Sequence, residues 1–306
     1  MVIGDAGRGV HRWVSESVRE RVLSNTLISS IMGTMDVNTH LHSLPKSRIL
    51  LARVARSARP FVDLAAAAEA LQWDRTRTAK QLARWHEQGF LRRIRRGVYT
   101  VVATAAMAQE RVVADPWALV PISFRHAYIA GWSAAEHWDL TEQVFTTLLV
   151  CTSDRIKHTT QQVAGATIRA RHVPQSWMFG TAVEWRDGAR VMVSDVHKTI
   201  VDMCIDPSLG GGIQHVSQCL RAYLCRDDID TDRLLAYANR AGSATAFKRL
   251  GFLCEVIGGH PTVVARCLQG VTLGLATLDP TIPSPRISKR WQLRLPKAWE
   301  KLLQND

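Results

Sequence analysis

Residues 81–102 read QLARWHEQGFLRRIRRGVYTVV, in which a helical pattern runs into a glycine and then into a cluster of arginines. Gly89 ends the pattern in the position that follows a helix C-cap. Two short runs then flank Gly97, and a glycine tolerates the positive φ that a tight hairpin turn requires, so we predict a β-hairpin. Its four guanidinium groups repel one another, which indicates a polyanionic partner; they belong to Arg92, Arg93, Arg95 and Arg96.

Three helices are expected before this hairpin. Ser47 is the predicted N-cap of the first helix, and Asp63 is the predicted N-cap of a short alanine-rich second helix. After a turn, Asp74 is expected to cap a third helix that begins at Arg75. Helix, helix, turn, helix and hairpin in this order predict a winged helix-turn-helix domain over residues 45–104.

The third helix divides into two faces. At 100° per residue, one sector roughly 100° wide contains only basic and polar side chains, those of Arg77, Lys80, Gln81 and Arg84. The opposite side is expected to pack on the other helices and consists of Ala79, Leu82, Ala83 and His86, with Trp85 at its margin. A recognition helix in the major groove has this division. An ordinary helix with a solvated basic face has it too, but that alternative does not explain the adjacent arginine hairpin.

The positive charge of the chain is concentrated in the same region. Residues 45–102 contain 13 Lys and Arg against four Asp and Glu, whereas the remaining 248 residues contain 26 against 23. A concentrated basic patch is typical of a protein that binds nucleic acid. The expected contacts to base edges come from Arg77, Lys80, Gln81 and Arg84, and those to phosphates from Arg75, Arg92, Arg93, Arg95 and Arg96.

Length and composition indicate a globular protein of two domains. The chain has 306 residues, of which 46% are hydrophobic and 22% are charged. No apolar run approaches the ~20 residues of a membrane span, and the first residues contain no signal-peptide core, so we expect a cytoplasmic protein without membrane contact.

The six cysteines form no C-x-x-C pair and are expected to be reduced core thiols. Residues 1–44 are expected to be a partly disordered extension or to precede the true start, for which Met32 and Met35 are candidates.

Residues 105–306 carry a mixed α/β pattern, so the predicted fold class of the chain is α+β, with a winged helix-turn-helix followed by a larger α/β domain. The expected elements are a helix with a Ser133–Glu136 capping box, strands over 144–152 and 166–173, a hairpin through Asp187-Gly188, a helix capped by Ser194 or Asp195, helices over 213–224, 231–241 and 245–257, and a closing edge strand around Trp291, Leu293 and Leu295.

The second domain contains no recognisable catalytic motif, and we expect neither an enzyme nor a cofactor nor a metal. It has no phosphate-binding loop, nucleophile elbow or H-E-x-x-H pattern. A zinc site from Cys204, His215, Cys219 and Cys225 is conceivable, but its spacings match no standard pattern. An anion site at the glycine-rich residues 208–212 is physically possible, but a flexible connector and helix start is the favoured interpretation.

A cluster of Asp195, His197, Asp202 and Asp206 also suggests a metal site. Two carboxylates ~10 Å apart along one helix cannot share an ion without ligands from another element. We therefore expect Asp195 to be a helix cap and Asp202 to pair with a basic residue such as Arg249.

From residue 45 onward the chain resembles the AbiEi family of type IV toxin–antitoxin antitoxins. The resemblance rests on five segments in the family's order, namely QLARWHEQGFLRRIRRGVY, AGWSAAEHWDL, VSDVHKTIVDMCIDPSLGGG, LLAYANRAGSATAFKRLGFLCEVIG and SPRISKRWQLRLP. It implies a winged helix that binds inverted repeats in its own promoter and represses the operon. It also implies a C-terminal antitoxin domain that counteracts a nucleotidyltransferase-like toxin. The first 44 residues depart from the usual start of the family.

Three functions are therefore considered. The first is an autorepressing antitoxin with duplex DNA and a cognate toxin as partners, the toxin being opposed with or without direct contact. The second is a transcriptional regulator whose C-terminal domain senses a ligand or a partner protein. The third is an enzyme that modifies the toxin, against which the missing nucleotide-binding motifs argue. The helix over residues 245–257 is either a toxin-opposing surface, with Lys248, Arg249 and Glu255 outward, or a core helix whose charges are solvated.

Overall fold

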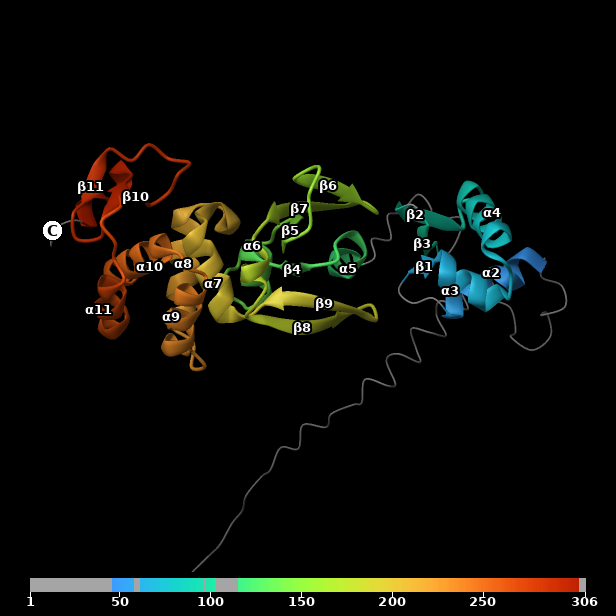
Figure 1. Cartoon of the computed structure of the whole chain (residues 1–306), viewed down its shortest axis with the longest axis horizontal. Helices are drawn as coiled ribbons and strands as arrows, with labels where there is room; N and C mark the ends of the chain where they lie inside the picture. The colour runs from blue at the N-terminus through green and yellow to red at the C-terminus, as the bar shows by residue number, and fades with distance from the viewer. Residues whose placement is uncertain (1–45, 58–60, 96, 103–114, 303–306) are drawn as a thin grey trace, which may run out of the picture. The chain divides into compact units, whose positions relative to one another are not determined.

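The computed structural model describes residues 46–57, 61–95, 97–102 and 115–302. The predicted extension over residues 1–44 lies outside the described residues. The fold is a mixed α+β fold, and the chain divides into two compact units between residues 112 and 113 (Figure 1).

The described helices of the first unit are α2 (Lys46–Ser57), α3 (Leu64–Leu71) and α4 (Arg75–Glu87). Two predicted caps are confirmed. Asp63 accepts a hydrogen bond from the backbone N–H of Ala66 at 2.7 Å, and Asp74 accepts one from that of Arg77 at 2.9 Å. The prediction for Ser47 is wrong because α2 already begins at Lys46. Ser47 Oγ instead accepts a hydrogen bond from Trp85 Nε1 at 2.9 Å, which ties α2 to α4.

The small sheet of this unit contains the predicted hairpin. Its strands are β1 (Val62–Asp63), β2 (Leu91–Arg95) and β3 (Val98–Val101), which pair antiparallel in the order β1-β3-β2. Gly97 has a φ of 79°, the left-handed conformation that the turn requires. Ile94 is an extra residue in β2, since Arg93 pairs with Tyr99 and Arg95 with Val98. Such a bulge bends a strand and increases its twist.

The core of the first unit differs from the prediction on one side of α4. The buried face of this helix consists of Thr78, Leu82 and Trp85. Ala79, Ala83 and His86 are exposed, so the predicted apolar face is wrong by about a quarter of a turn. The physical reason is size, because the fully buried Trp85 indole removes more apolar surface from water than two alanines and a histidine could. The indole packs with Leu51, Val54, Leu71 and Leu91.

A six-stranded mixed sheet forms the base of the second unit. Its strands are β4 (Ala127–Ile129), β5 (Thr147–Thr152), β6 (Thr160–Val163), β7 (Ala166–His172), β8 (Thr181–Arg186) and β9 (Ala189–Ser194). The order is β6-β7-β5-β4-β9-β8, with parallel pairing between β5 and β7 and between β4 and β9. The predicted hairpin through Asp187 and Gly188 is confirmed, and both residues have positive φ.

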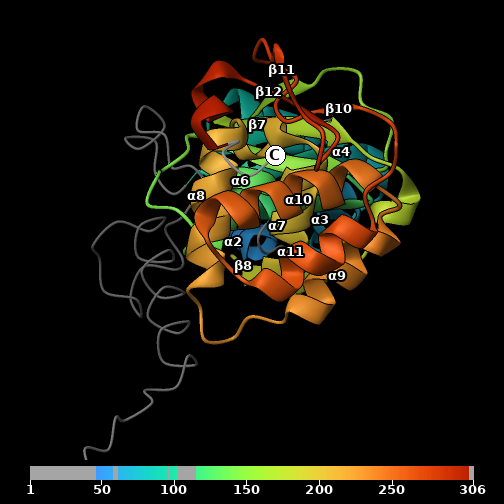
Figure 2. The same ribbon diagram turned by 90° about the vertical axis from the view of Figure 1, so that its left-hand side faces the viewer.

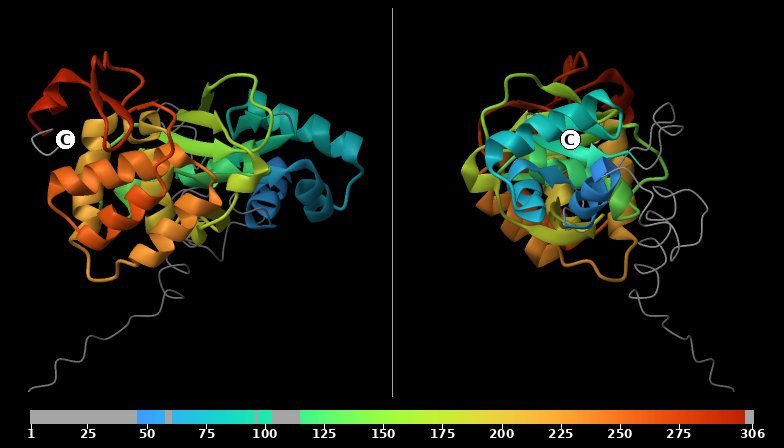
Figure 3. Two further views of the ribbon diagram at one scale, coloured as in Figure 1. Left: turned by 60° about the vertical axis from the view of Figure 1, so that its left-hand side comes forward. Right: turned by 90° about the vertical axis from the view of Figure 1, so that its right-hand side faces the viewer.

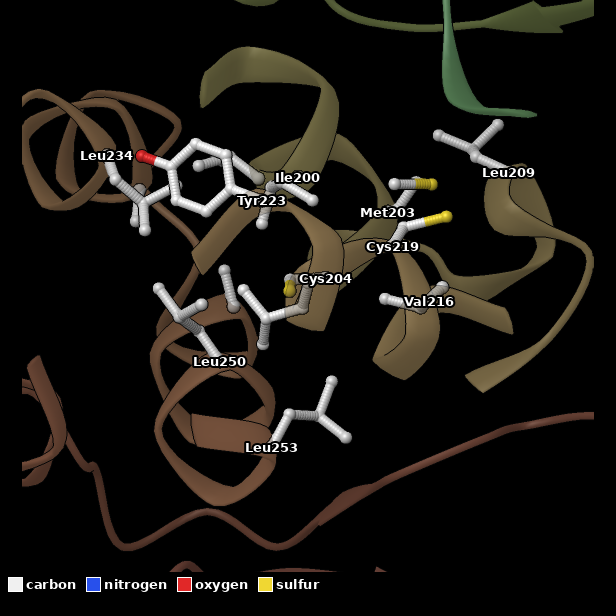
Figure 4. Packing of buried hydrophobic residues seen from close by; sticks show 14 of the residues in the cluster. Ile200, Met203, Cys204, Leu209, Val216, Cys219, Tyr223, Leu234, Leu250 and Leu253 are labelled. Carbon is white, nitrogen blue, oxygen red and sulfur yellow. The ribbon is translucent and has the colours of Figure 1, made fainter. Parts of the chain in front are cut away.

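Helices cover this sheet and build the main core. They are η2 (Pro116–Leu119), α5 (Val120–Ser123), α6 (Gly131–His137), η3 (Gln175–Trp177), α7 (Val196–Ile205), η4 (Pro207–Gly210), α8 (Ile213–Leu224), α9 (Thr231–Arg240), α10 (Ala244–Ile257), α11 (Pro261–Gln269) and η5 (Lys297–Leu302). Helix α7 packs against α6, α8, α9 and α10 and is the central helix of this layer. Figure 2 looks onto α9, α10 and α11, which contact one another. Figure 4 shows the interior between α7, α8 and α10, where Cys204, Val216 and Leu253 meet.

The capping box predicted for the first helix of this unit is wrong. Helix α6 begins at Gly131, two residues before Ser133, and its N-cap residue provides no side-chain hydrogen bond. Ser133 Oγ accepts a hydrogen bond from the Leu149 backbone instead, which joins α6 to β5. Asp195 is the true cap of α7, as one of the two predicted alternatives stated.

The C-terminal segment forms a separate small sheet rather than a closing edge strand. Strands β10 (Ala276–Thr277), β11 (Arg286–Ser288) and β12 (Leu293–Leu295) pair in the order β10-β12-β11, so the predicted edge strand is the central one. The views in Figure 3 show this red segment beside the helices. Trp291 is buried against Gly251 of α10, where a Cβ would collide with the indole ring.

None of the described helices combines the length and the apolar character that a membrane span requires.

All six cysteines are free thiols, as predicted, but Cys225 is exposed and the other five are buried. Burial raises the pKa of the Cys254 thiol to about 12, which keeps it protonated and unreactive.

Candidate nucleic-acid interface

Helix α4 presents most of its predicted contact residues to solvent. Asp74 and the turn at residues 72–74 fix where the helix begins, and the burial of Trp85 fixes its rotation. The side chains of Arg75, Arg77, Lys80 and Arg84 are exposed as a result, whereas Gln81 is half-buried. The guanidinium of Arg77 lies 4.0 Å from the centre of the Trp73 ring, and this cation–π contact restricts its orientation.

The hairpin contributes a second group of cations. Arg93 and Arg95 are exposed, and Arg92 is half-buried. Arg96 lies outside the described residues. Leu91 and Tyr99 are buried on the same hairpin and anchor it in the core of the unit. The hairpin therefore has an apolar attachment and a basic outer surface.

Backbone hydrogen bonds hold the hairpin against α3 and α4. Phe90 donates to the Trp85 carbonyl at 2.9 Å, so the turn after α4 is short and fixed. Leu64, at the start of α3, donates to the Gly97 carbonyl at 3.1 Å. The basic residues of α4 and of the hairpin therefore belong to one rigid unit, as a preformed binding surface requires.

In the described part of the chain, no ion pair within 4.0 Å involves the arginines or the lysine of α4, or Arg92, Arg93 and Arg95 of the hairpin. The Asp74 carboxylate attracts Arg77 at longer range. Two of the four acidic residues in residues 45–102 are engaged as the caps of α3 and α4. The backbone N–H of Arg77 lowers the pKa of Asp74 below its ordinary value, so this cap stays ionised at neutral pH. The surface therefore carries uncompensated positive charge.

The side chains of the Asp195, His197, Asp202 and Asp206 set have other partners in the second unit. In the described part of the chain, no three His, Cys, Asp or Glu residues are placed to hold a metal ion, which also applies to the zinc set of Cys204, His215, Cys219 and Cys225. His197 contacts the Tyr223 hydroxyl at 2.8 Å. Asp202 is fully buried and accepts a hydrogen bond from the Tyr128 hydroxyl at 2.9 Å.

Asp202 pairs with a basic residue, as predicted, but that residue is Lys198 and not the suggested Arg249. Lys198 Nζ contacts both the Asp202 carboxylate and the Tyr128 hydroxyl, and the whole side chain is buried. Burial raises the pKa of Asp202, and Lys198 opposes this shift. Arg249 donates instead to the backbone carbonyls of Cys204, Ile205 and Thr277. The i, i+4 spacing of Lys198 and Asp202 on α7 was the available signal for their pairing.

Helix α10 is a core helix, which excludes the outward arrangement of its charges. Lys248 and Arg249 are 2% and 4% exposed. Burial lowers the pKa of Lys248, whose ammonium group contacts the Gly274 carbonyl. Glu255 is half-buried. Its carboxylate accepts a hydrogen bond from Trp291 Nε1 and forms an ion pair with Arg290.

The glycine-rich segment before α8 is occupied by a carboxylate of this chain. Ile213, the first residue of α8, donates its backbone N–H to Asp279 Oδ2 at 2.9 Å. An internal carboxylate thus fills the position that an anion would take at the N-terminus of α8. The connector interpretation of residues 208–212 is the better one.

Comparison with known proteins shows similarity to solved structures alone. No family model and no curated protein matches the chain. Among solved structures, the crystal structure of the RV2827C protein from Mycobacterium tuberculosis is similar, with a TM-score of 0.58 and 15% identity over 81% of this chain and 89% of that chain. Identity at this level indicates a common fold and nothing about activity.

Proposed function

We propose that the first unit is a winged helix-turn-helix that binds duplex DNA. Helices α3 and α4, joined by the turn at residues 72–74, correspond to the helix-turn-helix, and strands β2 and β3 correspond to the wing. The observation that carries the proposal is the set of exposed, unpaired cations shared by α4 and the rigidly attached hairpin. Phosphate groups are the counter-charge that such a surface lacks.

The proposed contacts divide by position. Helix α4 enters the major groove, and its base contacts come from Arg77, Lys80, Gln81 and Arg84. Phosphate contacts come from Arg75 and from the hairpin residues Arg92, Arg93, Arg95 and Arg96. Since Arg77 stacks on Trp73, its guanidinium is held in place before DNA arrives. Ordering this side chain on binding therefore costs little conformational entropy.

We further propose that the whole chain is an autorepressing antitoxin of the AbiEi type. The sequence resemblance supports this proposal, and so does the presence of a second unit with its own sheet and core. In this proposal the first unit binds inverted repeats in the promoter, and the second opposes a nucleotidyltransferase-like toxin. Expression of the adjacent gene together with the full chain, or with residues 1–104 alone, tests it. Growth should be rescued by the full chain only.

The recognition role of α4 is tested by a double substitution. Arg77→Ala with Arg84→Ala should remove discrimination between the operator and unrelated DNA, because each good bidentate contact contributes about 1–3 kcal/mol. Arg53→Ala with Arg56→Ala is the matched control, since both arginines are exposed on α2 and the same charge is removed. Unchanged discrimination in the α4 variant would show that this helix does not read the bases.

A second candidate function is a winged-helix regulator whose second unit senses a small ligand. The observation that favours it is a cleft of about 540 Å³ in that unit. A toxin-like nucleotidyltransferase gene beside this one favours the antitoxin, and its absence favours the ligand-sensing regulator.

A further inference from the structure

A cleft in the second unit combines apolar walls with a few charged groups. It lies where the residues after β7 meet η4, the short helix that follows α7, and its volume is about 540 Å³. Clefts that hold small molecules commonly measure roughly 300–1,000 Å³ and have this mixture of apolar and polar lining. Its residues belong to neither α4 nor the basic hairpin, so a ligand here would be separate from the DNA.

The walls of the cleft suit a flat ring. Trp177 lines the cleft and is half-buried, and Pro174, Pro207 and Pro280 are also part of the lining. The Trp177 ring centre lies 5.7 Å from the buried Lys198 Nζ. The indole is therefore supported from the interior of the unit. A rigid aromatic ring of this kind is a stacking platform for a nucleobase.

The charged groups of the cleft form an arginine–aspartate pair. The Arg171 side chain is 59% exposed, and its Nη2 lies 3.0 Å from Asp206 Oδ2. Asp206 Oδ1 accepts hydrogen bonds from the Ser208 backbone N–H at 3.1 Å and from its hydroxyl at 2.7 Å. Asp206 Oδ2 is buried and faces the Arg171 guanidinium, so the ion pair holds that guanidinium at the edge of the cleft. The exposed part of the guanidinium remains available to an anion.

We propose that this cleft binds a nucleoside 5′-phosphate. The base stacks on Trp177, and the phosphate accepts hydrogen bonds from the exposed part of the Arg171 guanidinium. The planar fork of an arginine matches a phosphate. The proposal concerns binding alone, and it does not depend on whether the first unit binds DNA.

Calorimetric titration of the full chain with AMP, GMP, CMP and UMP tests the proposal. At least one of the four should bind with a Kd below about 1 mM, and inorganic phosphate should bind at least roughly tenfold more weakly than that nucleotide. Arg171→Ala and Trp177→Ala should each weaken nucleotide binding roughly tenfold, whereas Trp177→Phe, which keeps a stacking ring, should retain it within about threefold.

Matched controls remove the same side chains elsewhere on the unit. Arg221→Ala on α8 and Trp185→Ala on β8 replace exposed residues that do not line the cleft, and they should leave nucleotide binding unchanged. Thermal unfolding of each variant verifies that it folds. The proposal is overturned if no nucleotide binds at millimolar concentration or if phosphate binds as tightly as the nucleotide. It is also overturned if the folded Arg171→Ala variant binds the nucleotide as tightly as wild type.

Discussion

Lys198 and Asp202 form an ion pair with no exposed side-chain surface in the middle of the second unit. Three aromatic rings surround the ammonium group, those of Tyr128 and Phe179 at 5.0 Å and that of Trp177 at 5.7 Å. Removing a charge from water costs several kcal/mol, and here the partner charge and the Tyr128 hydroxyl offset that cost. The pair is therefore sensitive to the loss of either member.

Lys198→Met should lower the free energy of unfolding by about 3–5 kcal/mol, because it leaves the Asp202 carboxylate buried without its counter-charge. Urea denaturation measures this change. The double variant Lys198→Met with Asp202→Leu removes both charges and should be more stable than the single variant. A single variant as stable as wild type, or a double variant less stable than the single one, would contradict the role given to the pair.

The partners of buried charged residues could not be predicted from the sequence, whereas several helix caps could. Asp63, Asp74 and Asp195 were recognised as caps because a cap depends on a backbone N–H three residues away. Lys248 and Arg249 were expected at the surface, because their backbone-carbonyl partners lie more than 25 residues away in sequence. The capping box predicted for Ser133 was wrong for the same reason, since the hydrogen-bond partner of its hydroxyl is the backbone of the distant Leu149. The aspartate caps could thus be predicted from local sequence, whereas the serine caps and the long-range partners could not.

At the scale of elements, the turn of the β2-β3 hairpin depends on one glycine. Gly97 has a φ of 79° and open space where a Cβ would stand, so an alanine there would be strained by its backbone alone. Gly97→Ala should lower the stability of the first unit by roughly 1–2 kcal/mol. Thermal unfolding measures this, and Gly274→Ala, at a glycine without positive φ and with open space, is the control. Equal effects of the two substitutions would show that the turn tolerates a side chain.

The link between α8 and the C-terminal segment depends on the ionised Asp279. Burial would raise the pKa of this carboxyl, but hydrogen bonds from Thr281 and from the Ile213 backbone outweigh it and lower the pKa below 3.8. As the pH falls, the unfolded chain binds this proton before the folded one does. The stabilisation is therefore complete above about pH 4 and is lost as the pH falls through the folded pKa. Asp279→Asn should flatten the dependence of stability on pH below 4, measured by urea unfolding, and an unchanged slope would contradict this.

The order of the helices and strands was predicted better than their number or the face that each helix buries. The hairpins at Gly97 and at Asp187-Gly188 were predicted because their turn residues are distinctive. Helix α11 and strand β4 were missed, since β4 has three residues and α11 begins at Pro261 after a short loop. The rotation of α4 was also mispredicted, because only packing shows that Trp85 outweighs the small residues beside it.

At the scale of the whole molecule, the excess of positive charge is concentrated in the first unit. Residues 45–102 contain 13 Lys and Arg against four Asp and Glu, whereas several charges of the second unit are paired or buried. This division explains why the candidate DNA contacts could be predicted from charge density and helical spacing. The cleft beside Trp177 could not, because its lining comes from segments far apart in the sequence. DNA affinity should therefore be governed by the first unit.

The salt dependence of promoter binding tests that expectation most directly. Fluorescence anisotropy of a labelled promoter fragment, titrated with the full chain at several salt concentrations, gives the slope of log K against log salt. About five phosphate contacts predict a slope near −4 to −5 for wild type. Replacing Arg92, Arg93, Arg95 and Arg96 by glutamine should reduce its magnitude by roughly 3 to 4 and abolish binding at moderate salt. An unchanged slope and unchanged occupancy in that variant would contradict the DNA-binding role of the hairpin.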